Sequence, residues 1–310
     1  MVGTVVNFCT NEFRFLRDCL EQALLFSDEV VAVAASHFFD GTLENRELLE
    51  KIYTAFPQVQ FVEYPFLPAA IPNWIFHEVN LENFWHCLSR WIGFSKLSSR
   101  VKWVLFLDAD EVADGKRFSA WMKRGEFTEE KVLKLANYWY FREPIYRAKS
   151  FEDSVLFVSK DQVTADLILH SHERDALYDL SRKKKKRGVV GLDGAPMFHH
   201  FSWVRTEEEM LRKVKSWGHK KDRNWEELVQ EEFSSPFKGV DFVHGYEFQT
   251  VTTPFALDGS LPLPSYQKRN IQRLSEEEMV FFAMQKPFPS EKRGFWRKMG
   301  RLLKERWLSG

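Results

Sequence analysis

The stretch Lys102-Trp103-Val104-Leu105-Phe106-Leu107-Asp108-Ala109-Asp110-Glu111 decides the fold. Its first six residues are apolar apart from Lys102, which predicts a strand that is buried on both faces and therefore central in a sheet. Carboxylates follow directly at the carboxyl end of this strand, and open α/β sheets bind their ligands at that edge. The stretch therefore predicts an α/β protein with a polar site at the end of a central strand.

Alternating strands and helices surround this central strand. Short β-branched or apolar runs predict strands, and apolar residues at helical spacing predict helices between them. The expected strands are 2–9, 30–34, 59–64 and 197–204, with antiparallel strands within 133–163, and the expected helices are 13–24, 43–53 and 83–97. A capping box from Thr206 to Glu209 predicts the start of a further helix.

This order predicts a mostly parallel, mixed sheet with helices on both faces. We expect the sheet and its helices to form a core at 1–205, with a helical and loop extension packed on it at 206–290. The end of the chain, 291–310, is a basic amphipathic tail.

The composition is that of an ordinary globular protein. The chain has 310 residues, of which 44% are hydrophobic, and its 44 Lys and Arg residues balance 44 Asp and Glu residues. Because there is no net basic charge, the sequence does not favour a nucleic-acid partner. Three cysteines, Cys9, Cys19 and Cys87, predict buried thiols rather than a disulfide framework. With no signal-like or membrane-spanning apolar run, they favour a cytoplasmic protein.

Asp108 and Asp110 have a spacing that lets both carboxylates reach one divalent cation. Magnesium and manganese prefer oxygen ligands, and the diphosphate of a nucleotide would complete such a shell. Solvated turns carry similar acidic runs, but the buried strand that precedes this one favours the metal site. Of the adjacent His199 and His200, which face opposite sides of a strand, at most one is expected to reach the metal.

Five features, taken in order, resemble the family-2-like glycosyltransferases of the A-type fold. They are Asn11-Glu12 after the first strand, Ser36 with Asp40-Gly41-Thr42 after the second, Arg90 in the helix before the acidic strand, Leu105 to Glu111, and His200-Phe201-Ser202-Trp203. The resemblance covers roughly 2–205. It implies the A-type glycosyltransferase fold, in which a single Rossmann-like mixed sheet has helices on both faces.

The resemblance also implies a role for each matching residue. Asp108, Asp110 and His200 would ligate Mn²⁺ or Mg²⁺, and the residues expected to bind the nucleotide-diphospho-sugar donor are Asn11, Asp40, Arg90 and Asp108. Many members carry an acidic residue after the second strand that reads the base. This chain has Ala34-Ala35-Ser36 there, so the resemblance does not identify the base.

The implied activity is metal-dependent, inverting transfer of a hexosyl or related sugar to a glycan, lipid or protein acceptor. Inverting transfer needs a carboxylate base, and the candidates downstream of the acidic run are Glu173, Asp175 and Asp193. Two alternatives stay open. One is a nucleotidyltransferase, although the segment 7–11 lacks the glycine-rich loop of that class. The other is a catalytically silent relative that only binds glycans or a partner.

Two basic segments remain. The run at 182–187 predicts a solvated loop, with contact to an anionic substrate or membrane as the alternative. The tail at 291–310 carries Trp296 and Trp307 among basic residues, a pattern typical of helices that lie on anionic membranes. It predicts peripheral contact with the inner membrane face, and docking on its own domain is the alternative.

Overall fold

The computed structural model describes residues 1–71, 81–170, 177, 187–216, 223–263 and 268–285. The tail at 291–310 and most of the basic run at 182–187 lie outside the described residues. The strands are β1 Val2–Asn7, β2 Glu29–Ala35, β3 Gln60–Tyr64, β4 Trp103–Asp108, β5 Glu111–Ala113, β6 Val132–Phe141, β7 Glu143–Ser159, β8 Phe198–Trp203, β9 Phe248–Thr250 and β10 Ile271–Arg273.

The helices are α1 Phe13–Ala23, α2 Arg46–Ala55, α3 Leu81–Lys96, α4 Gly115–Met122, α5 Ala165–His170, α7 Glu207–Ser216, α8 Trp225–Phe233 and α9 Glu276–Ala283. Short 3₁₀ turns are η1 Thr10–Glu12, η2 Pro68–Ala70, η4 Glu126–Glu129 and η5 Lys160–Gln162. Within the described residues, no helix has both the length and the apolar character needed to cross a membrane.

One mixed sheet joins all the strands, in the order β10-β3-β2-β1-β4-β7-β6-β8-β5, and β9 adds to β7. From β10 to β4 every pair is parallel. The long strand β7 then pairs antiparallel with both β4 and β6. The predicted mixed sheet, its central acidic strand and its added antiparallel strands are therefore confirmed.

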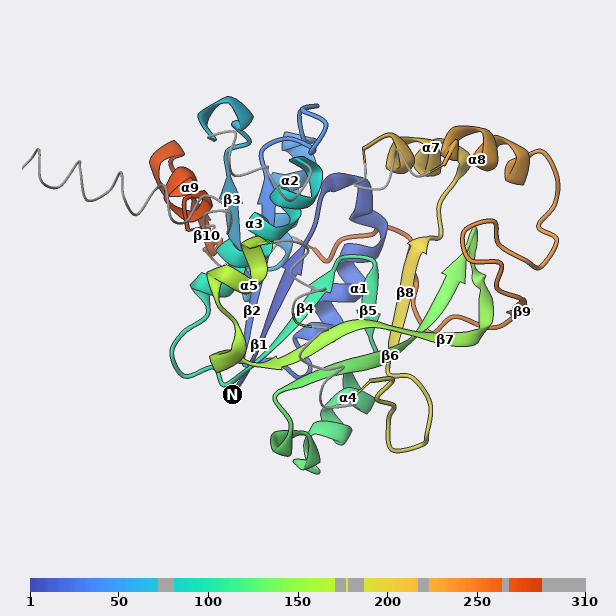
Figure 1. Cartoon of the computed structure of the whole chain (residues 1–310), viewed down its shortest axis with the longest axis horizontal. Helices are drawn as coiled ribbons and strands as arrows, with labels where there is room; N and C mark the ends of the chain where they lie inside the picture. The colour runs from blue at the N-terminus through green and yellow to red at the C-terminus, as the bar shows by residue number, and fades with distance from the viewer. Residues whose placement is uncertain (72–80, 171–176, 178–186, 217–222, 264–267, 286–310) are drawn as a thin grey trace, which may run out of the picture.

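The second half of the sheet curls back toward the end of β4. Only Ala109 and Asp110 separate β4 from β5, yet three strands lie between β4 and β5 in the sheet order. The run from β4 through β7, β6 and β8 must therefore turn until β5 comes back beside the end of β4 (Figure 1). This curl surrounds the acidic turn with side chains from β8 and α7.

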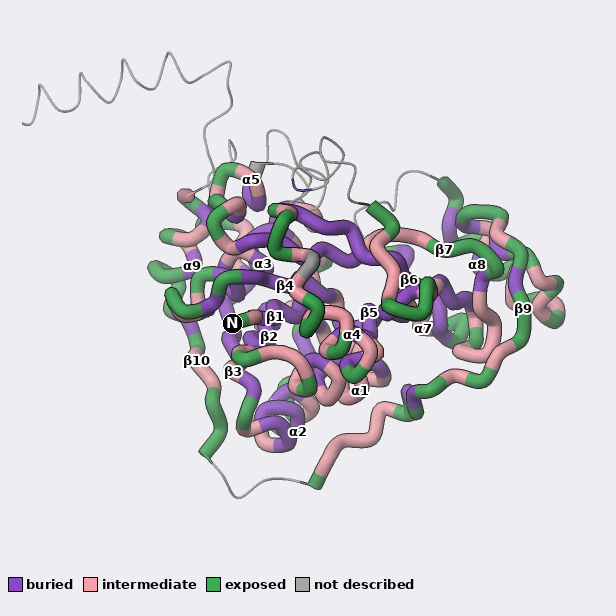
Figure 2. The backbone as a smooth tube through the Cα atoms, turned by 90° about the horizontal axis from the view of Figure 1, so that it is seen from below, coloured by how far each residue is buried: buried purple, intermediate pink, exposed green. Residues whose placement is uncertain are grey.

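Helices cover both faces of the sheet, as predicted. The core on one face includes α1, α2 and α4, and the core on the other includes α3, α5 and α9. Close packing of α3 depends on Gly93, because a Cβ there would lie 2.5 Å from Val5 Cγ1 and 2.8 Å from Val33 Cγ2. Figure 2 shows that the strands beneath these helices form the buried centre of the molecule.

The part of the chain after residue 205 packs on this core and also contributes strands to its sheet. Helices α7 and α8 lie together beyond the carboxyl end of β8 (Figure 1), over a third cluster that includes Trp139, Trp203 and Trp225. The segment after β9 runs back along α1, where Leu257 N donates to Asp18 Oδ2 at 3.0 Å. The chain then reaches β10, which pairs with β3 at the far edge of the sheet.

Candidate active site at the carboxyl edge of the sheet

The parallel strands β1, β2 and β4 all end at the same edge of the sheet. The turn η1 follows β1, and Asp108 is the last residue of β4. Charged side chains from β8, α3 and α7 reach this edge as well. We use the name carboxyl-edge site for the cluster of Glu12, Arg90, Asp108, Asp110, His200, Arg205 and Lys213.

Asp108 is held by α3. Its Oδ1 accepts a hydrogen bond of 2.5 Å from Arg90 Nη2, and the Arg90 side chain is almost fully buried. Arg90 Nη1 lies 2.8 Å from His86 Nδ1, so His86 also belongs to this group. A buried guanidinium beside a carboxylate stabilises the ionised form of that carboxylate. Arg90 therefore positions Asp108.

Asp110 lies in the turn between β4 and β5 and is 2% exposed. Its Oδ2 is 3.4 Å from Arg205 Nη2 and 3.8 Å from Lys213 Nζ, whereas its Oδ1 is 3.7 Å from His200 Nε2. The backbone fixes this arrangement, because Phe201 N donates to the carbonyl oxygen of Asp110 at 2.8 Å. The structure thus places Asp110 between an imidazole and two cations, of which Arg205 is buried and Lys213 is partly buried.

Arg205 ties the turn after β1 to the end of β8. It is 1% exposed, and its Nη1 donates to the carbonyl oxygen of Asn11 at 3.1 Å. Its Nη2 also approaches Glu12 Oε1 at 3.5 Å. Burial and the nearby Asp110 charge raise the pKa of Glu12 to about 8. Burial and the neighbouring Arg205 lower the pKa of Lys213.

Glu111 has a structural place in the acidic run. It is fully buried, its Oε2 accepts from Asp108 N at 3.0 Å, and its Oε1 accepts from Ser154 Oγ at 3.0 Å. These bonds fix the turn that aims Asp108 and Asp110 at the edge of the sheet. Glu111 therefore supports the site from within the sheet.

The two histidines of β8 have separate surroundings. His200 faces Asp110, as given above, while His199 Nδ1 shares a hydrogen bond of 2.8 Å with the Tyr140 hydroxyl. His199 packs against Tyr140 and Phe255, and burial lowers its pKa to about 3. His200 is therefore the one that reaches the acidic run.

The structure places the other predicted site residues as follows. Asn11 reaches the site through its carbonyl oxygen. Asp40 is exposed, and its Oδ1 accepts from Thr42 N at 2.9 Å within its own turn. Asp193 is exposed beside α4, where Arg117 Nη2 donates to its Oδ1 at 2.6 Å, and the structure does not bring it to Asp110. Glu173 and Asp175 lie outside the described residues.

The donors around Asp110 suit a hard divalent cation only in part. Among the described residues, no group of three or more His, Cys, Asp or Glu side chains is close enough to form a ready metal site. Asp110 Oδ1 and His200 Nε2 do face each other, and His200 Nδ1 has no hydrogen-bond partner within the described chain. Asp108 is turned to Arg90. A metal bound here would draw on Asp110 and His200 first.

No protein-family model matches this sequence, and no curated protein matches it significantly. Among the solved structures that it resembles is 4-diphosphocytidyl-2C-methyl-D-erythritol synthase from Anaerococcus prevotii, with 10% identity and a TM-score of 0.40 over 67% of this chain and 92% of that one. Another is the glycosyltransferase GlyE of Streptococcus pneumoniae, with 11% identity and a TM-score of 0.32 over 77% of this chain and 66% of that one.

A third is the galactosyltransferase LgtC in complex with donor and acceptor sugar analogs, with 11% identity and a TM-score of 0.34 over 76% of this chain and 98% of that one. These TM-scores correspond to loose superpositions. The function therefore has to be argued from the residues of the carboxyl-edge site.

Proposed function

We propose that this chain is a glycosyltransferase that moves a sugar from a nucleotide-diphosphate donor to a hydroxyl acceptor. The observation that carries the proposal is the convergence of two strand-end aspartates, a histidine and three cations at the carboxyl edge of a mostly parallel sheet. A diphosphate leaving group needs positive charge close to it as its bond to the sugar breaks. Buried cations are effective there because little water screens them.

Arg205 and Lys213 are the residues that would receive the diphosphate. Arg205 is buried, the Lys213 side chain is 15% exposed, and both lie within 3.8 Å of Asp110 Oδ2, so Asp110 holds them in place before the donor binds. Guanidinium and ammonium groups donate charge-assisted hydrogen bonds to phosphate oxygens. Arg90 keeps Asp108 oriented from the side of α3.

A divalent cation, manganese or magnesium, belongs to the proposal: held by Asp110, His200 and Asp108, it would offset charge on the departing nucleoside diphosphate. The carboxylate oxygens and the imidazole nitrogen are donors that these ions accept. We also propose that transfer inverts the configuration at the anomeric carbon and that the donor sugar is a hexose or a related sugar. The acceptor would be a glycan, a lipid or a protein, and the protein would be cytoplasmic.

The test is calorimetric titration of the natural protein with a panel of nucleotide-diphospho-sugars, with and without manganese. We expect one class of nucleotide sugar to bind, more tightly with manganese. Asp110→Asn should weaken that binding at least tenfold, which is about 1.4 kcal/mol. Asp193→Asn is the matched control, because it removes the same charge from an exposed site beside α4 and should leave binding unchanged.

A thermal melt of each variant shows whether Asp110→Asn is folded. If it is not, Arg90→Lys supplies the second variant, since it keeps the positive charge beside Asp108 but loses the guanidinium geometry. Failure of the natural protein to bind any nucleotide sugar in the presence of manganese would overturn the proposal.

A further inference from the structure

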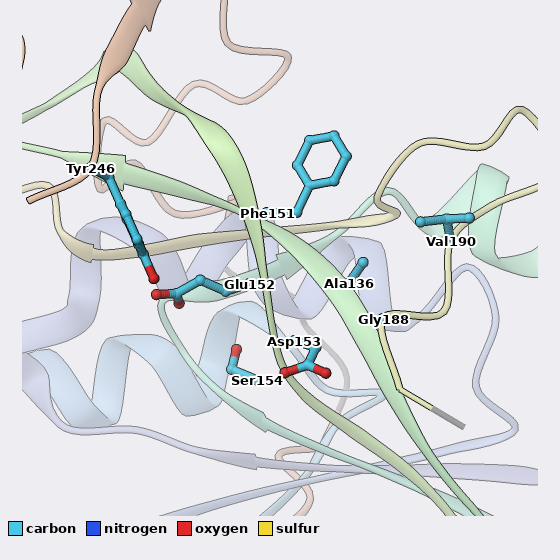
Figure 3. Close-up of a pocket in the computed structure, with 8 residues that line it drawn as sticks. All are labelled: Ala136, Phe151, Glu152, Asp153, Ser154, Gly188, Val190 and Tyr246. Atoms are coloured by element: carbon cyan, nitrogen blue, oxygen red, sulfur yellow. The ribbon is translucent and has the colours of Figure 1, made fainter. Parts of the chain in front are cut away.

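A pocket of about 560 Å³ lies against β7, within the size range of small-molecule sites. Its lining includes Phe151, Glu152 and Ser154 from β7 and Tyr246 from the segment before β9. Figure 3 shows the carboxylate of Glu152 and the hydroxyl of Tyr246 pointing toward each other. We call this cavity the β7 pocket.

The β7 pocket borders the carboxyl-edge site. In the antiparallel pairing of β4 with β7 the last pair is Phe106 with Leu156, so Asp108 and Ser154 come at the same level two residues further along each strand. Ser154 Oγ donates to Glu111, whose other oxygen accepts from Asp108 N. Glu152 follows along β7, beyond the point where β4 ends. The wall of the pocket is therefore bonded to the turn that carries Asp108.

An irregularity in β7 sets the direction of Glu152. Leu135 of β6 pairs with Val155, but Asn137 pairs with Glu152, so β7 has one extra residue between these pairs. Such bulges redirect side chains and are common beside active sites. At this irregularity the backbone nitrogen of Ser154 donates to Asn137 Oδ1 at 2.9 Å.

Contacts between rings place Glu152 on the same side of the sheet as Asp110. The Trp139 ring lies between two histidine rings, with its centroid 5.0 Å from that of His200 and 5.0 Å from that of His244. His244 Nε2 in turn lies 3.7 Å from Glu152 Oε1. Asp110, His200, Trp139, His244 and Glu152 thus follow one another across β6.

The Glu152 carboxylate has no lysine or arginine partner in the described part of the chain. In the described part of the chain its partners are His244 and the Tyr246 hydroxyl, and neither carries a fixed positive charge. The adjacent Asp153 differs, because Lys134 Nζ lies 2.9 Å from its Oδ1 and Arg187 Nε lies 3.0 Å from its Oδ2. Of these two carboxylates, only Glu152 has no Lys or Arg partner among the described residues.

We infer that the β7 pocket receives the acceptor, that the acceptor is an uncharged sugar, and that Glu152 is the catalytic base. The inference rests on the proposed function. The proton of the acceptor hydroxyl passes to the Glu152 carboxylate as the acceptor oxygen forms a bond to the anomeric carbon of the donor sugar. The bond from that carbon to the diphosphate oxygen breaks, and its electron pair leaves with the nucleoside diphosphate.

The lining determines the acceptor class. Tyr246 offers aromatic surface beside Glu152 to the apolar side of a sugar ring, whereas the ring of Phe151, which is 52% exposed, extends from the other side of β7 (Figure 3). Glu152 and Ser154 can accept hydrogen bonds from the hydroxyls of such a sugar. No Lys, Arg or His is among the described lining residues, and two carboxylates are. Asp153 is paired with Lys134 and Arg187, so it is the carboxylate of Glu152 that would repel a phosphorylated or otherwise anionic acceptor placed beside it.

The test compares the natural protein with Glu152→Gln, which removes the base but keeps the size of the side chain. Donor binding is measured by calorimetry, and transfer is measured by mass spectrometry with neutral p-nitrophenyl glycosides and their phosphorylated counterparts. We expect Glu152→Gln to bind donor within twofold of the natural protein and to lose transfer at least 100-fold, the scale of general base catalysis. Only neutral glycosides should accept the sugar.

Two further variants make the result specific. Glu247→Gln is the matched control, because Glu247 follows Tyr246 but pairs with Lys149 at the surface, and it should leave transfer unchanged. Tyr246→Phe keeps the ring but removes the hydroxyl beside Glu152, so we expect a higher KM for the acceptor. If Glu152→Gln does not fold, the KM of Tyr246→Phe is the remaining readout, and an unchanged KM overturns the inference.

The inference and the proposed function fail differently. No donor binding by the natural protein overturns the proposed function. Donor binding with undiminished transfer in Glu152→Gln overturns the assignment of the base. Donor binding without transfer to any neutral glycoside, or with preference for a phosphorylated one, overturns the acceptor class.

Discussion

Glu44 shows how a single buried carboxyl group joins two loops at the edge of the sheet. It follows β2 and is 7% exposed, and its Oε2 accepts from the backbone nitrogen of Thr10 at 3.1 Å and from the Thr10 hydroxyl. Burial raises its pKa to about 7, although the bonds from Thr10 act in the opposite direction. Between about pH 4.5 and pH 7 the folded protein therefore holds a proton on Glu44 that the unfolded chain releases.

This difference predicts how stability depends on pH. Because the folded pKa is about 7 and the model-compound value is 4.5, the contribution is full below about pH 4.5 and is lost as pH rises to 7. The natural protein should lose on the order of 3 kcal/mol relative to Glu44→Gln over that window. Urea unfolding of both proteins at several pH values measures this difference. If the free energy of unfolding had the same pH dependence in both proteins, the prediction would be wrong.

A matched control for this pH series is Glu47→Gln on α2. Glu47 is exposed, and the hydrogen bond from Lys51 lowers its pKa. A carboxyl group with a lowered pKa cannot produce a loss of stability as pH rises. Between about pH 4.5 and pH 7, the free energy of unfolding of Glu47→Gln should therefore fall with pH as steeply as that of the natural protein.

At the same scale, the sequence showed the aspartates but not all of their partners. Asp108 and Asp110 were predicted as site residues because they directly follow a buried strand, and Arg90 was predicted from the family resemblance. Arg205 and Asp110 are 95 positions apart, and their contact depends on how β8 returns to the turn after β4. Glu12, which lies 3.5 Å from Arg205, was not predicted as a site residue, because exposed and buried acids look alike in a sequence.

Among the elements, helix α7 carries Lys213 to the carboxyl-edge site, and its first turn fixes where the helix begins. Glu209 N donates to Thr206 Oγ1 at 3.3 Å, and Thr206 N donates to Glu209 Oε2 at 2.8 Å, which is the predicted capping box. Lys213 lies one turn further along and approaches Asp110. The cap therefore determines where this cation is placed.

We predict that Thr206→Ala lowers the free energy of unfolding by about 1 kcal/mol, the usual effect of losing a cap. It should also weaken nucleotide-sugar binding several-fold, because fraying of the first turn moves Lys213. Ser275→Ala is the control, since α9 has the same capping box with Glu278 and packs on the α3 side of the sheet. Ser275→Ala should lower the free energy of unfolding by a similar amount and leave nucleotide-sugar binding unchanged. Equal effects of both variants on binding would refute the link to Lys213.

Element boundaries were predictable where apolar periodicity was strong. Helices α1, α2 and α3 and strands β1 to β4 lie where the pattern placed them. The short strands β5 and β10, of three residues each, were not predicted, because a three-residue strand has no period of its own and forms only against a partner. The extra residue in β7 is equally invisible, since it exists only relative to β6.

At the scale of the whole molecule, the site lies where the parallel half of the sheet meets its curled half. Asp108 ends the parallel half, Asp110 lies in the turn to β5, and His200 comes from β8 beside β5. The curl that closes β5 back on β4 brings these residues together. The sequence predicted a mixed α/β fold and the edge that holds the site, but the curl follows from strand order, which periodicity does not encode.

Release of nucleoside diphosphate from a nucleotide sugar tests the central claim most directly. With manganese present, the natural protein should release it from one class of nucleotide sugar, and Asp193→Asn should match it within twofold. Asp110→Asn should be at least 100-fold slower, because the cations around the leaving group lose the carboxylate that holds them. Release from no nucleotide sugar by the natural protein, or equal release by a folded Asp110→Asn, would contradict the account.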